Sequence, residues 1–288
     1  MTTSSLIGSV LADRYEIVDE VGHGALGVVY RARHLVMEKT VAVKVLFEEM
    51  DKDENTFLRF QREAQAASSM SHPNIVTVYD FGISKNNTPF LVMDFIEGQD
   101  LKDVLRSQGR LPVDRSVKIF LQMCSALEHA HSKGILHRDI KPENVVLVKT
   151  SWNPEFVKLV DFGIAKYVNE PNRNAKKLTM DGQVLGTPAY MSPEQIMGGR
   201  LDARSDIYCM GVLMYNLISG KLPILGKDST ETMSKHITDL PTELADACPE
   251  IKIPFRLQRA IMKTLKKHPQ DRHQSMRELL VELENYKD

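Results

Sequence analysis

The sequence predicts an α+β fold of two lobes, a small lobe of β-strands with one helix and a larger, mainly helical lobe. Short segments rich in β-branched and aromatic residues fill the N-terminal third, and amphipathic helical patterns fill the remainder. The composition changes at Glu97-Gly98-Gln99, which we take as the connector. We expect a lead over residues 1–12, a first lobe over 13–96, a second lobe over 97–286, and a ligand in the cleft between the lobes.

Strands are predicted in the first lobe where short apolar runs are bounded by turn residues. The predicted strands are Tyr15–Val18, Val28–Ala32, Val41–Val45, Ile75–Tyr79 and Phe90–Met93. One helix interrupts them between Phe57 and Met70, because Phe57, Phe60, Ala64 and Ala67 recur at helical spacing.

Helices are predicted in the second lobe where apolar residues form a stripe. These helices are Asp114–Ser132, Ser205–Ile218, Ile253–Lys267 and Ser275–Tyr286. The segment Ser205–Ile218 is almost wholly apolar, so we expect it to be buried.

Composition and charge are those of a soluble globular protein. Hydrophobic residues make up 42% and charged residues 26%, and the formal net charge is -1. This balance gives no long-range attraction to nucleic acid or to a membrane surface, so any phosphate has to be bound by locally placed charge. Met210–Ile218 is too short to span a bilayer, and the N-terminus lacks signal-peptide character. We expect a cytoplasmic location, as a soluble protein or as the cytosolic domain of a longer, membrane-anchored one.

The cysteines Cys124, Cys209 and Cys248 are few, odd in number and widely separated. This pattern is typical of reduced, buried thiols in a cytosolic protein and not of a disulfide framework. No pair has C-x-x-C spacing, so we expect no zinc site.

A glycine-rich loop, Gly22-His23-Gly24-Ala25-Leu26-Gly27, precedes the strand segment Val28–Ala32. Glycines allow the backbone to approach phosphate oxygens and to point N–H groups at them. A dinucleotide site would require a helix directly after the last glycine, but strand-like residues follow. The sequence therefore predicts a β-hairpin over phosphate groups, with a plain tight turn as the alternative.

Lys44 ends the apolar run Val41-Ala42-Val43-Lys44. The alternative interpretation is an exposed lysine on an edge strand. Its apolar flanks favour a strand that faces the cleft, where the ammonium needs a carboxylate partner. Glu63 on the predicted helix supplies that carboxylate, and the ion pair would orient the α- and β-phosphates.

The strongest motif is His137-Arg138-Asp139-Ile140-Lys141-Pro142-Glu143-Asn144. Together with the glycine loop, the Lys44 motif and Asp161-Phe162-Gly163, it resembles the catalytic core of eukaryotic-type serine/threonine protein kinases. The motifs follow the family's order from about Asp13 to about Asn285, so the resemblance covers nearly the whole chain as one kinase domain. It implies a kinase-like fold with an antiparallel sheet in the first lobe. The runs at 72–76, 135–144 and 190–195 are most similar to bacterial members.

The resemblance implies transfer of the γ-phosphoryl group of ATP, in which positioning and charge neutralisation dominate. Asp139 is expected to accept or orient the proton of the incoming hydroxyl, and Lys141 to stabilise the transferring phosphoryl group. Asn144 and Asp161 are oxygen ligands suited to Mg²⁺, for which Mn²⁺ is expected to substitute. Alone, they would be a capping asparagine and a turn aspartate.

The resemblance also bears on the acceptor. Lys141, two residues after Asp139, is typical of serine/threonine enzymes. The run Gly186–Glu194 is similar to the family's peptide-docking loop and favours protein substrates, although Ser192 replaces the usual alanine. Thr187 is expected to hydrogen-bond near Asp139 and Lys141.

Two carboxylates are expected to be structural. Glu194 is predicted to form a buried ion pair with Arg272 that anchors the docking loop. Asp206 is predicted to hold the backbone of the catalytic loop.

The adenine pocket is assigned by resemblance alone, and the sequence does not distinguish its walls from ordinary core residues. The assigned residues are the walls Val29, Ala42 and Val146, Met93 at the back, the backbone of Asp94 and Ile96 at the ring edge, and Asp100 at the ribose.

The polar segment from Ile164 to Met191 buries little and is expected to be mobile until something orders it. Thr179 lies where related bacterial enzymes place an activation-loop phosphosite. By motif, Arg59, Arg138 and Lys166 are placed to meet a phosphate there. We hypothesise that autophosphorylation of Thr179, through self-association in trans, activates the enzyme. The alternatives are that these cations face solvent or that Asp181 supplies part of the charge.

Two other functions stay open as alternatives. A non-catalytic pseudokinase would have lost Lys44, Asp139, Asn144 or Asp161, and all of these are present. A small-molecule phosphotransferase is disfavoured by the docking-loop motif. Leu26 departs from the family, which commonly has an aromatic residue at the tip of the glycine loop.

Overall fold

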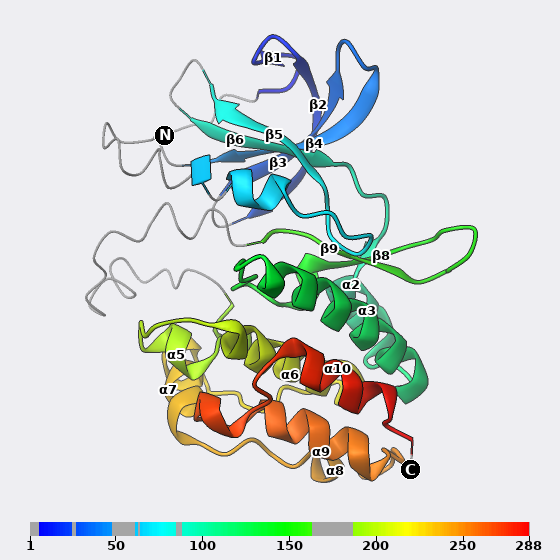
Figure 1. The fold of residues 1–288 in the computed structure, drawn as a ribbon, viewed down its shortest axis with the longest axis vertical. Helices are drawn as coiled ribbons and strands as arrows, with labels where there is room; N and C mark the ends of the chain where they lie inside the picture. The colour runs from blue at the N-terminus through cyan, green and yellow to red at the C-terminus, as the bar shows by residue number, and fades with distance from the viewer. Residues whose placement is uncertain are drawn as a thin grey trace. The chain divides into compact units, whose positions relative to one another are not determined.

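The computed structural model describes residues 6–24, 27–47, 61–62, 64–84, 88–162 and 187–287. The chain divides into two compact units. Figure 1 shows the chain as a ribbon with its helices and strands labelled. The N-terminal unit contains residues 1–71, 76–97 and 164–171, and the C-terminal unit contains residues 72–75, 98–163 and 172–288.

The N-terminal unit is built on one antiparallel sheet with the strand order β1-β2-β3-β4-β6-β5. Its strands are β1 (Val10–Leu11), β2 (Tyr15–Gly24), β3 (Gly27–His34), β4 (Lys39–Leu46), β5 (Val78–Ile83) and β6 (Pro89–Asp94). The predicted strands at Tyr15, Val28, Val41 and Phe90 are thereby confirmed, and each is longer than predicted. The sheet is antiparallel, as the resemblance implied.

The pairing register sorts the residues of this sheet onto two faces, because side chains alternate along a strand. One face carries the hydrophobic core of the unit, which consists of Leu11, Tyr15, Ile17, Val28, Tyr30, Ala32, Val41, Val43, Phe90 and Val92. The other face carries Val29 opposite Lys44 and Ala42 opposite Met93. These four residues, all predicted to contact a nucleotide, therefore share the face that this core does not use.

The predicted strand Ile75–Tyr79 is wrong at its start, because β5 begins at Val78. Ile75 instead forms an isolated parallel bridge with Leu159. The side-chain amide of Asn74 donates to the carbonyl oxygen of Val157 at 2.8 Å, and residues 72–75 belong to the C-terminal unit. The apolar run thus crosses from one unit to the other, which its β-branched composition does not reveal.

The helix predicted between Phe57 and Met70 is present where the structure describes it, over residues 61–62 and 64–68. Ala64 and Ala67 are 0% and 2% exposed, as the helical stripe predicted. Phe57 and Phe60 lie outside the described residues.

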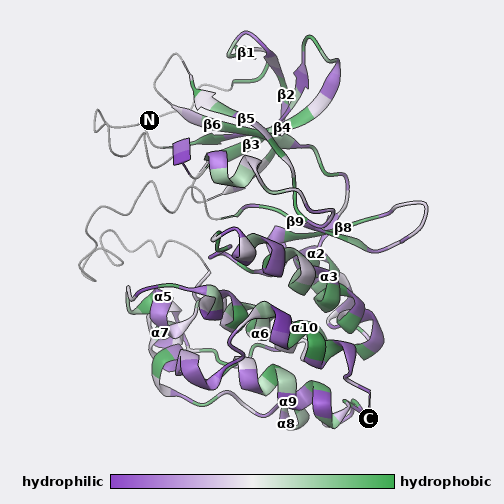
Figure 2. Cartoon of the chain, in the orientation of Figure 1, coloured by the Kyte–Doolittle hydropathy of each residue, from purple (hydrophilic) through white to green (hydrophobic). Residues whose placement is uncertain are grey.

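The C-terminal unit is mainly helical, and Figure 2 shows both hydrophobic and hydrophilic residues along its outer helices. Its α-helices are α2 (Leu101–Gln108), α3 (Val113–Ser132), α5 (Pro193–Ile196), α6 (Ala203–Ser219), α7 (Ser229–Thr238), α8 (Leu244–Ala247), α9 (Phe255–Thr264) and α10 (Met276–Glu284). Single turns of 3₁₀-helix lie at η1 (Pro142–Asn144), η4 (Pro188–Tyr190) and η5 (Pro269–Asp271). The predicted helices are confirmed as α3, α6, α9 and α10, the last two being shorter than predicted.

The centre of this unit is α6, which is buried from Ser205 to Ser219 and packs against α3, α9 and α10. Gly211 allows α9 to come close, because a Cβ there would lie 1.8 Å from Thr264 Oγ1. The predicted burial of Ser205–Ile218 is confirmed. Cys124 and Cys209 on these helices, and Cys248, are free and buried, also as predicted.

A second, three-stranded antiparallel sheet lies in the C-terminal unit and was not predicted. It consists of β7 (Gln99–Asp100), β8 (Val145–Val148) and β9 (Phe156–Leu159) in that order. Gly98 just before it is required by close packing, because a Cβ would lie 2.5 Å from the carbonyl oxygen of Leu147. The sheet links the connector to the strand that directly follows the catalytic motif.

Candidate active site

The glycine loop is a β-hairpin, as predicted. β2 and β3 pair through Gly22 with Val29, His23 with Val28, and Gly24 with Gly27, and the tip residues Ala25 and Leu26 lie outside the described residues. A strand and not a helix follows Gly27, which excludes the dinucleotide-type loop.

The glycines of this hairpin have different structural requirements. A Cβ at Gly27 would lie 2.2 Å from the carbonyl oxygen of Val45, so the approach of β4 already requires glycine there. A Cβ at Gly22 would meet no described atom within 4 Å. Packing therefore accounts for Gly27, whereas Gly22 leaves open space of the kind a phosphate group needs.

Lys44 lies at the middle of β4, directly across from Val29 on β3 and Leu91 on β6, and is half-buried. It is therefore not on an edge strand, which removes the alternative interpretation. Glu63, its predicted partner, lies outside the described residues.

The remaining adenine-pocket residues have mixed environments. Ala42 and Met93 are each 7% exposed, and Val29 and Val146 are half-buried. The N–H of Asp94 donates to the carbonyl oxygen of Thr77 at 3.0 Å, and the contact of its backbone with the adenine ring stays a prediction. Asp100 is the N-cap of α2, where its carboxylate accepts from the amide of Asp103 at 2.8 Å. This cap accounts for Asp100 structurally, and its contact with ribose stays a prediction, as does the backbone contact of Ile96.

The catalytic motif forms a compact polar cluster in the C-terminal unit. Lys141 Nζ lies 2.9 Å from Asp139 Oδ2. Asn144 Nδ2 donates to the same Oδ2 at 3.0 Å and to the backbone carbonyl of Asp139 at 2.7 Å. Asn144 is 5% exposed and sits at the end of η1, directly before β8. The structure thus brings Asp139, Lys141 and Asn144 together.

Asp206 holds the backbone of this loop, which confirms that prediction. It is 1% exposed, and its carboxylate accepts from the amide of His137 at 2.8 Å and the amide of Arg138 at 2.9 Å. His131 Nε2 lies 2.8 Å from the same carboxylate. Burial alone would raise the pKa of Asp206, but the His131 hydrogen bond and the neighbouring charges outweigh it and leave the pKa lowered.

Asp161 follows β9 and has a backbone φ of 57°, in the left-handed region that non-glycine residues rarely adopt. Arg138, next to Asp139, has a φ of 61°. Phe162 directly follows Asp161, and the centroid of its ring lies 4.5 Å from that of the His137 ring. The Asp161 motif therefore packs against the catalytic motif. Backbone strain of this kind is common at functional sites, where the surroundings hold it in place.

A small cavity lies beside the cluster. Its lining includes Asp139 and Lys141 from the catalytic motif, Thr187 and Tyr190 from the predicted docking loop, and Cys209 from α6. The structure therefore places Thr187 close to Asp139 and Lys141, and its hydrogen-bonding role stays a prediction.

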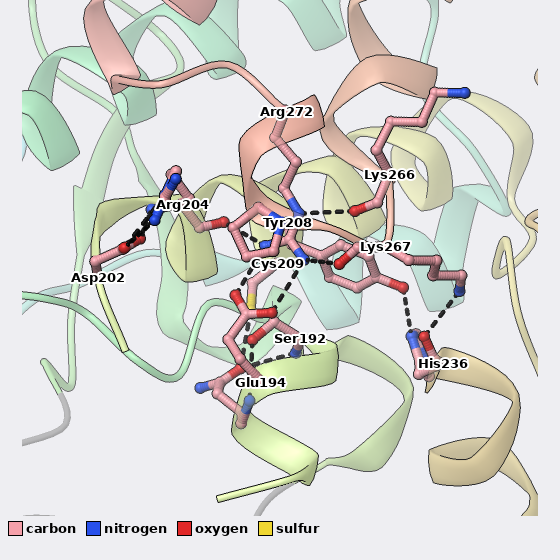
Figure 3. Close-up of polar contacts among 12 residues, drawn as sticks. Ser192, Glu194, Asp202, Arg204, Tyr208, Cys209, His236, Lys266, Lys267 and Arg272 are labelled. Atoms are coloured by element: carbon pink, nitrogen blue, oxygen red, sulfur yellow. Dashed lines mark hydrogen bonds and ion pairs between the residues drawn. The ribbon is translucent and has the colours of Figure 1, made fainter. Parts of the chain in front are cut away.

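The predicted ion pair between Glu194 and Arg272 is confirmed (Figure 3). Two parallel bonds of 2.8 and 3.0 Å join the guanidinium to the carboxylate, and the Arg272 side chain is 0% exposed. Its other N–H groups donate to the carbonyl oxygens of Arg204, Lys266 and Lys267. Burial opposes ionisation of Glu194, but the hydrogen bond and charge of Arg272 keep its pKa lowered. This pair anchors the end of the docking loop, where α5 begins.

Several predicted site residues lie outside the described residues. They are Glu63, the phosphosite Thr179, and the phosphate-pocket residues Arg59 and Lys166. Arg138, the remaining residue predicted to meet the phosphate, lies in the catalytic loop.

The sequence matches the family model of the protein kinase domain over residues 15–283. The chain belongs to the protein kinase family. The kinase domain is 40% identical over 282 residues to the serine/threonine-protein kinase pkn3 of Myxococcus xanthus, covering 98% of this chain and 51% of the relative. It is 35% identical over 276 residues to the serine/threonine-protein kinase PknB of Mycobacterium leprae, covering 95% of this chain and 43% of the relative. The resemblance to bacterial serine/threonine kinases is thereby confirmed.

Solved structures confirm the predicted α+β kinase fold. The kinase domain of PknI from Mycobacterium tuberculosis superposes with a TM-score of 0.74 at 28% identity, over 99% of both chains. Rad53 1–466 in complex with AMP-PNP gives a TM-score of 0.75 at 26% identity, over 93% of this chain and 64% of that one. This chain spans about half the length of the curated relatives. Among the helices of the described residues, none is long and apolar enough to cross a membrane.

Sequence reasoning did not identify Gln195 as part of the site. Its side chain lies between the docking loop and the catalytic loop and donates to the carbonyl oxygen of Arg138 at 2.8 Å. A backbone acceptor leaves no mark in the sequence, so only the capping pattern Ser192-x-x-Gln195 could have drawn attention to it.

Proposed function

We propose that this kinase domain transfers the γ-phosphoryl group of ATP to serine or threonine hydroxyls of protein substrates. The proposal depends on the cluster in which Lys141 and Asn144 both contact Asp139 Oδ2, at 2.9 and 3.0 Å. A carboxylate held in this way is suited to orient a hydroxyl and accept its proton, and the adjacent ammonium is suited to neutralise charge on the transferring group.

The residues present fit a magnesium nucleotide. The amide nitrogen of Asn144 faces Asp139, which leaves its amide oxygen Oδ1 as the atom suited to a metal ion. Asp161 would add a carboxylate ligand. The open space at Gly22 suits phosphate oxygens. Asn144 and Asp161 would hold Mg²⁺, or Mn²⁺ in its place, and the ion would neutralise charge on the phosphate groups.

The register of the sheet in the N-terminal unit supports the nucleotide contacts that we assign there. Val29, Ala42, Lys44 and Met93 share the face that is not used by the core. We assign Lys44, with Glu63 as its partner, to the α- and β-phosphates and the apolar residues to the adenine ring. Gly24, the backbone of Asp94 and Ile96, Asp100 and Val146 complete this assignment.

The test of catalysis is incubation with γ-labelled ATP, Mg²⁺ and a protein or peptide acceptor. Asp139→Asn should lower the transfer rate by about 10²–10⁴-fold while nucleotide affinity stays near that of the unsubstituted protein. Asp246→Asn, at an exposed carboxylate on α8, is the matched control and should keep full activity. Nucleotide binding without transfer by the unsubstituted protein would instead favour the pseudokinase alternative, and transfer only to metabolites would favour the small-molecule alternative.

Autophosphorylation of Thr179 in trans is our proposal for activation. A phosphate there would meet the cations of Arg59, Arg138 and Lys166, tying together helix, catalytic loop and activation loop. Thr179→Ala should be as inactive as the phosphatase-treated unsubstituted protein, and only the latter should recover on incubation with ATP. Equal rates before and after phosphatase treatment would remove the switch.

The physiological setting is proposed from length and composition. The chain spans about half the length of its curated relatives. We propose a cytoplasmic location, as a soluble protein or as the cytosolic domain of a longer, membrane-anchored one. Its partners would be protein substrates and, for autophosphorylation, a second copy.

A further inference from the structure

Gln195 lies at a junction of three segments. It is the third residue of α5, directly after the docking loop, and one end of its side chain reaches the catalytic loop. The orientation of the carboxamide is fixed by unambiguous partners. The amide of Ser192 can only donate and contacts Oε1 at 2.9 Å, whereas the carbonyl of Arg138 can only accept and contacts Nε2 at 2.8 Å. Cys209 Sγ donates to Oε1 at 3.2 Å from α6.

The contact falls on a strained point of the backbone. Arg138 has a φ of 61°, and a non-glycine residue keeps such a conformation only where its surroundings determine it. The N–H of Arg138 donates to Asp206 at 2.9 Å, and its C=O accepts from Gln195 at 2.8 Å. The two side chains therefore hold the residue from both sides.

The carbonyl of Arg138 and the N–H of Asp139 belong to one peptide plane. On the other side of this plane, the N–H of Asp139 donates to His137 Nδ1 at 3.4 Å, a longer contact than the one from Gln195. Rotation of the plane would change the direction in which the Asp139 carboxylate points. Gln195 is thus placed to set the orientation of Asp139 from the docking-loop side.

The residue type agrees with this role. Glutamate or glutamine can complete a capping box at the third helical position, because either side chain accepts from the N-cap amide. Only glutamine can also donate to the Arg138 carbonyl. A carboxylate there would bring two acceptor oxygens together at hydrogen-bond distance.

We propose that Gln195 is a positioning residue for phosphoryl transfer, coupling the docking loop to the orientation of Asp139. The inference depends on the proposed kinase function. It predicts that loss of the donor lowers kcat for a peptide acceptor more than it raises KM for ATP, because the nucleotide contacts are made by other residues.

The test compares Gln195→Glu and Gln195→Met with the unsubstituted chain across pH. Near neutral pH, Gln195→Glu should lower kcat by about 10²-fold, the scale of a small misplacement of a reacting group. As pH falls, the new carboxyl group takes up a proton and regains a donor, so its kcat relative to the unsubstituted chain should rise. Gln195→Met has similar volume and no donor, so its kcat should stay low at every pH. This variant still tests the inference if Gln195→Glu does not fold.

Ser275→Ala is the control for a general helix-capping effect. Ser275 caps α10, away from the site, by accepting from the amide of Glu278 at 3.2 Å. It should leave kcat and its pH profile unchanged. Kinetics of both Gln195 variants that match those of the unsubstituted chain, or a Gln195→Glu defect that does not respond to pH, would overturn the inference. Inactivity of the unsubstituted chain would instead refute the proposed function.

Discussion

Arg272 shows how strongly one buried residue can depend on its partner. Its guanidinium is fully buried between Glu194 and three backbone carbonyls. Removing a single partner from a buried pair leaves an uncompensated charge. We expect Glu194→Gln to lower the free energy of unfolding by about 3–5 kcal/mol in urea titrations. The exposed pair of Arg110 and Glu250 is the control, and Glu250→Gln should lower the free energy of unfolding far less, because solvent screens that pair. Equal losses at the two pairs would contradict this account.

His236 on α7 gives a prediction about pH. It is fully buried, and burial, with a further contribution from the charge of Lys267, lowers its pKa to about 4. In the unfolded chain a histidine titrates near about 6.5. Between these values the unfolded chain binds a proton that the folded chain does not, so stability is complete above this window and falls as pH falls through it.

We expect His236→Phe to flatten the pH dependence of the unfolding free energy below about pH 6.5, by up to about 1.4 kcal/mol per pH unit. Loss of the bond between His236 Nδ1 and the Tyr208 hydroxyl, 2.9 Å long, adds a cost that does not depend on pH. The slope is therefore the informative quantity, measured by urea unfolding at several pH values. An unchanged slope would mean that folding does not lower the pKa of His236.

Single residues could be predicted from the sequence where their role depends on a motif. Asp206 and the pair of Glu194 with Arg272 were assigned in this way, and the structure confirms their contacts. Gln195 was missed because its partners are a backbone carbonyl and a thiol distant in the sequence. Asp100 was assigned to the ribose, but its role as the N-cap of α2 was not predicted, although an aspartate before a helix is a common N-cap.

At the scale of elements, the glycine hairpin contains one glycine that packing requires, Gly27, and one that faces open space, Gly22. Gly27→Ala should lower the thermal midpoint, because its Cβ would overlap the backbone of β4 at Val45. Gly22→Ala meets no described atom within 4 Å and should leave the midpoint unchanged while raising KM for ATP. Thermal unfolding of both variants, followed by kinetics of the folded ones, checks this. A stability loss at Gly22 as large as at Gly27 would show that both glycines are structural.

Elements with strong periodicity could be predicted, and weak ones could not. α3 and α6 have clear apolar stripes or a continuous apolar run, and both were located to within a few residues. The strands β7, β8 and β9 have two to four residues each, too few for an alternation pattern to stand out. The start of β5 was misplaced because residues 72–75 pair with the C-terminal unit, a tertiary contact that overrides local propensity.

At the scale of the whole molecule, the residues that we assign to the nucleotide and its metal ion are divided between the two compact units. Lys44 and Ala42 belong to the N-terminal unit, whereas Asp139, Asn144 and Asp161 belong to the C-terminal unit. Each unit has its own core, so each group can be positioned independently of a nucleotide. The proposed function therefore predicts that substitutions in either unit weaken nucleotide binding.

AMP-PNP with Mg²⁺, at about one hundred times its Kd, should raise the unfolding free energy by about 2.7 kcal/mol, seen as an increased thermal midpoint. Lys44→Met and Asp161→Asn should each reduce this increase, because the proposed function assigns Lys44 to the phosphates and Asp161 to the metal ion. Lys252→Met, at an exposed position before α9, should retain it in full. A full increase in either site variant would contradict the assignment of that residue, even if the chain proved to be an active kinase.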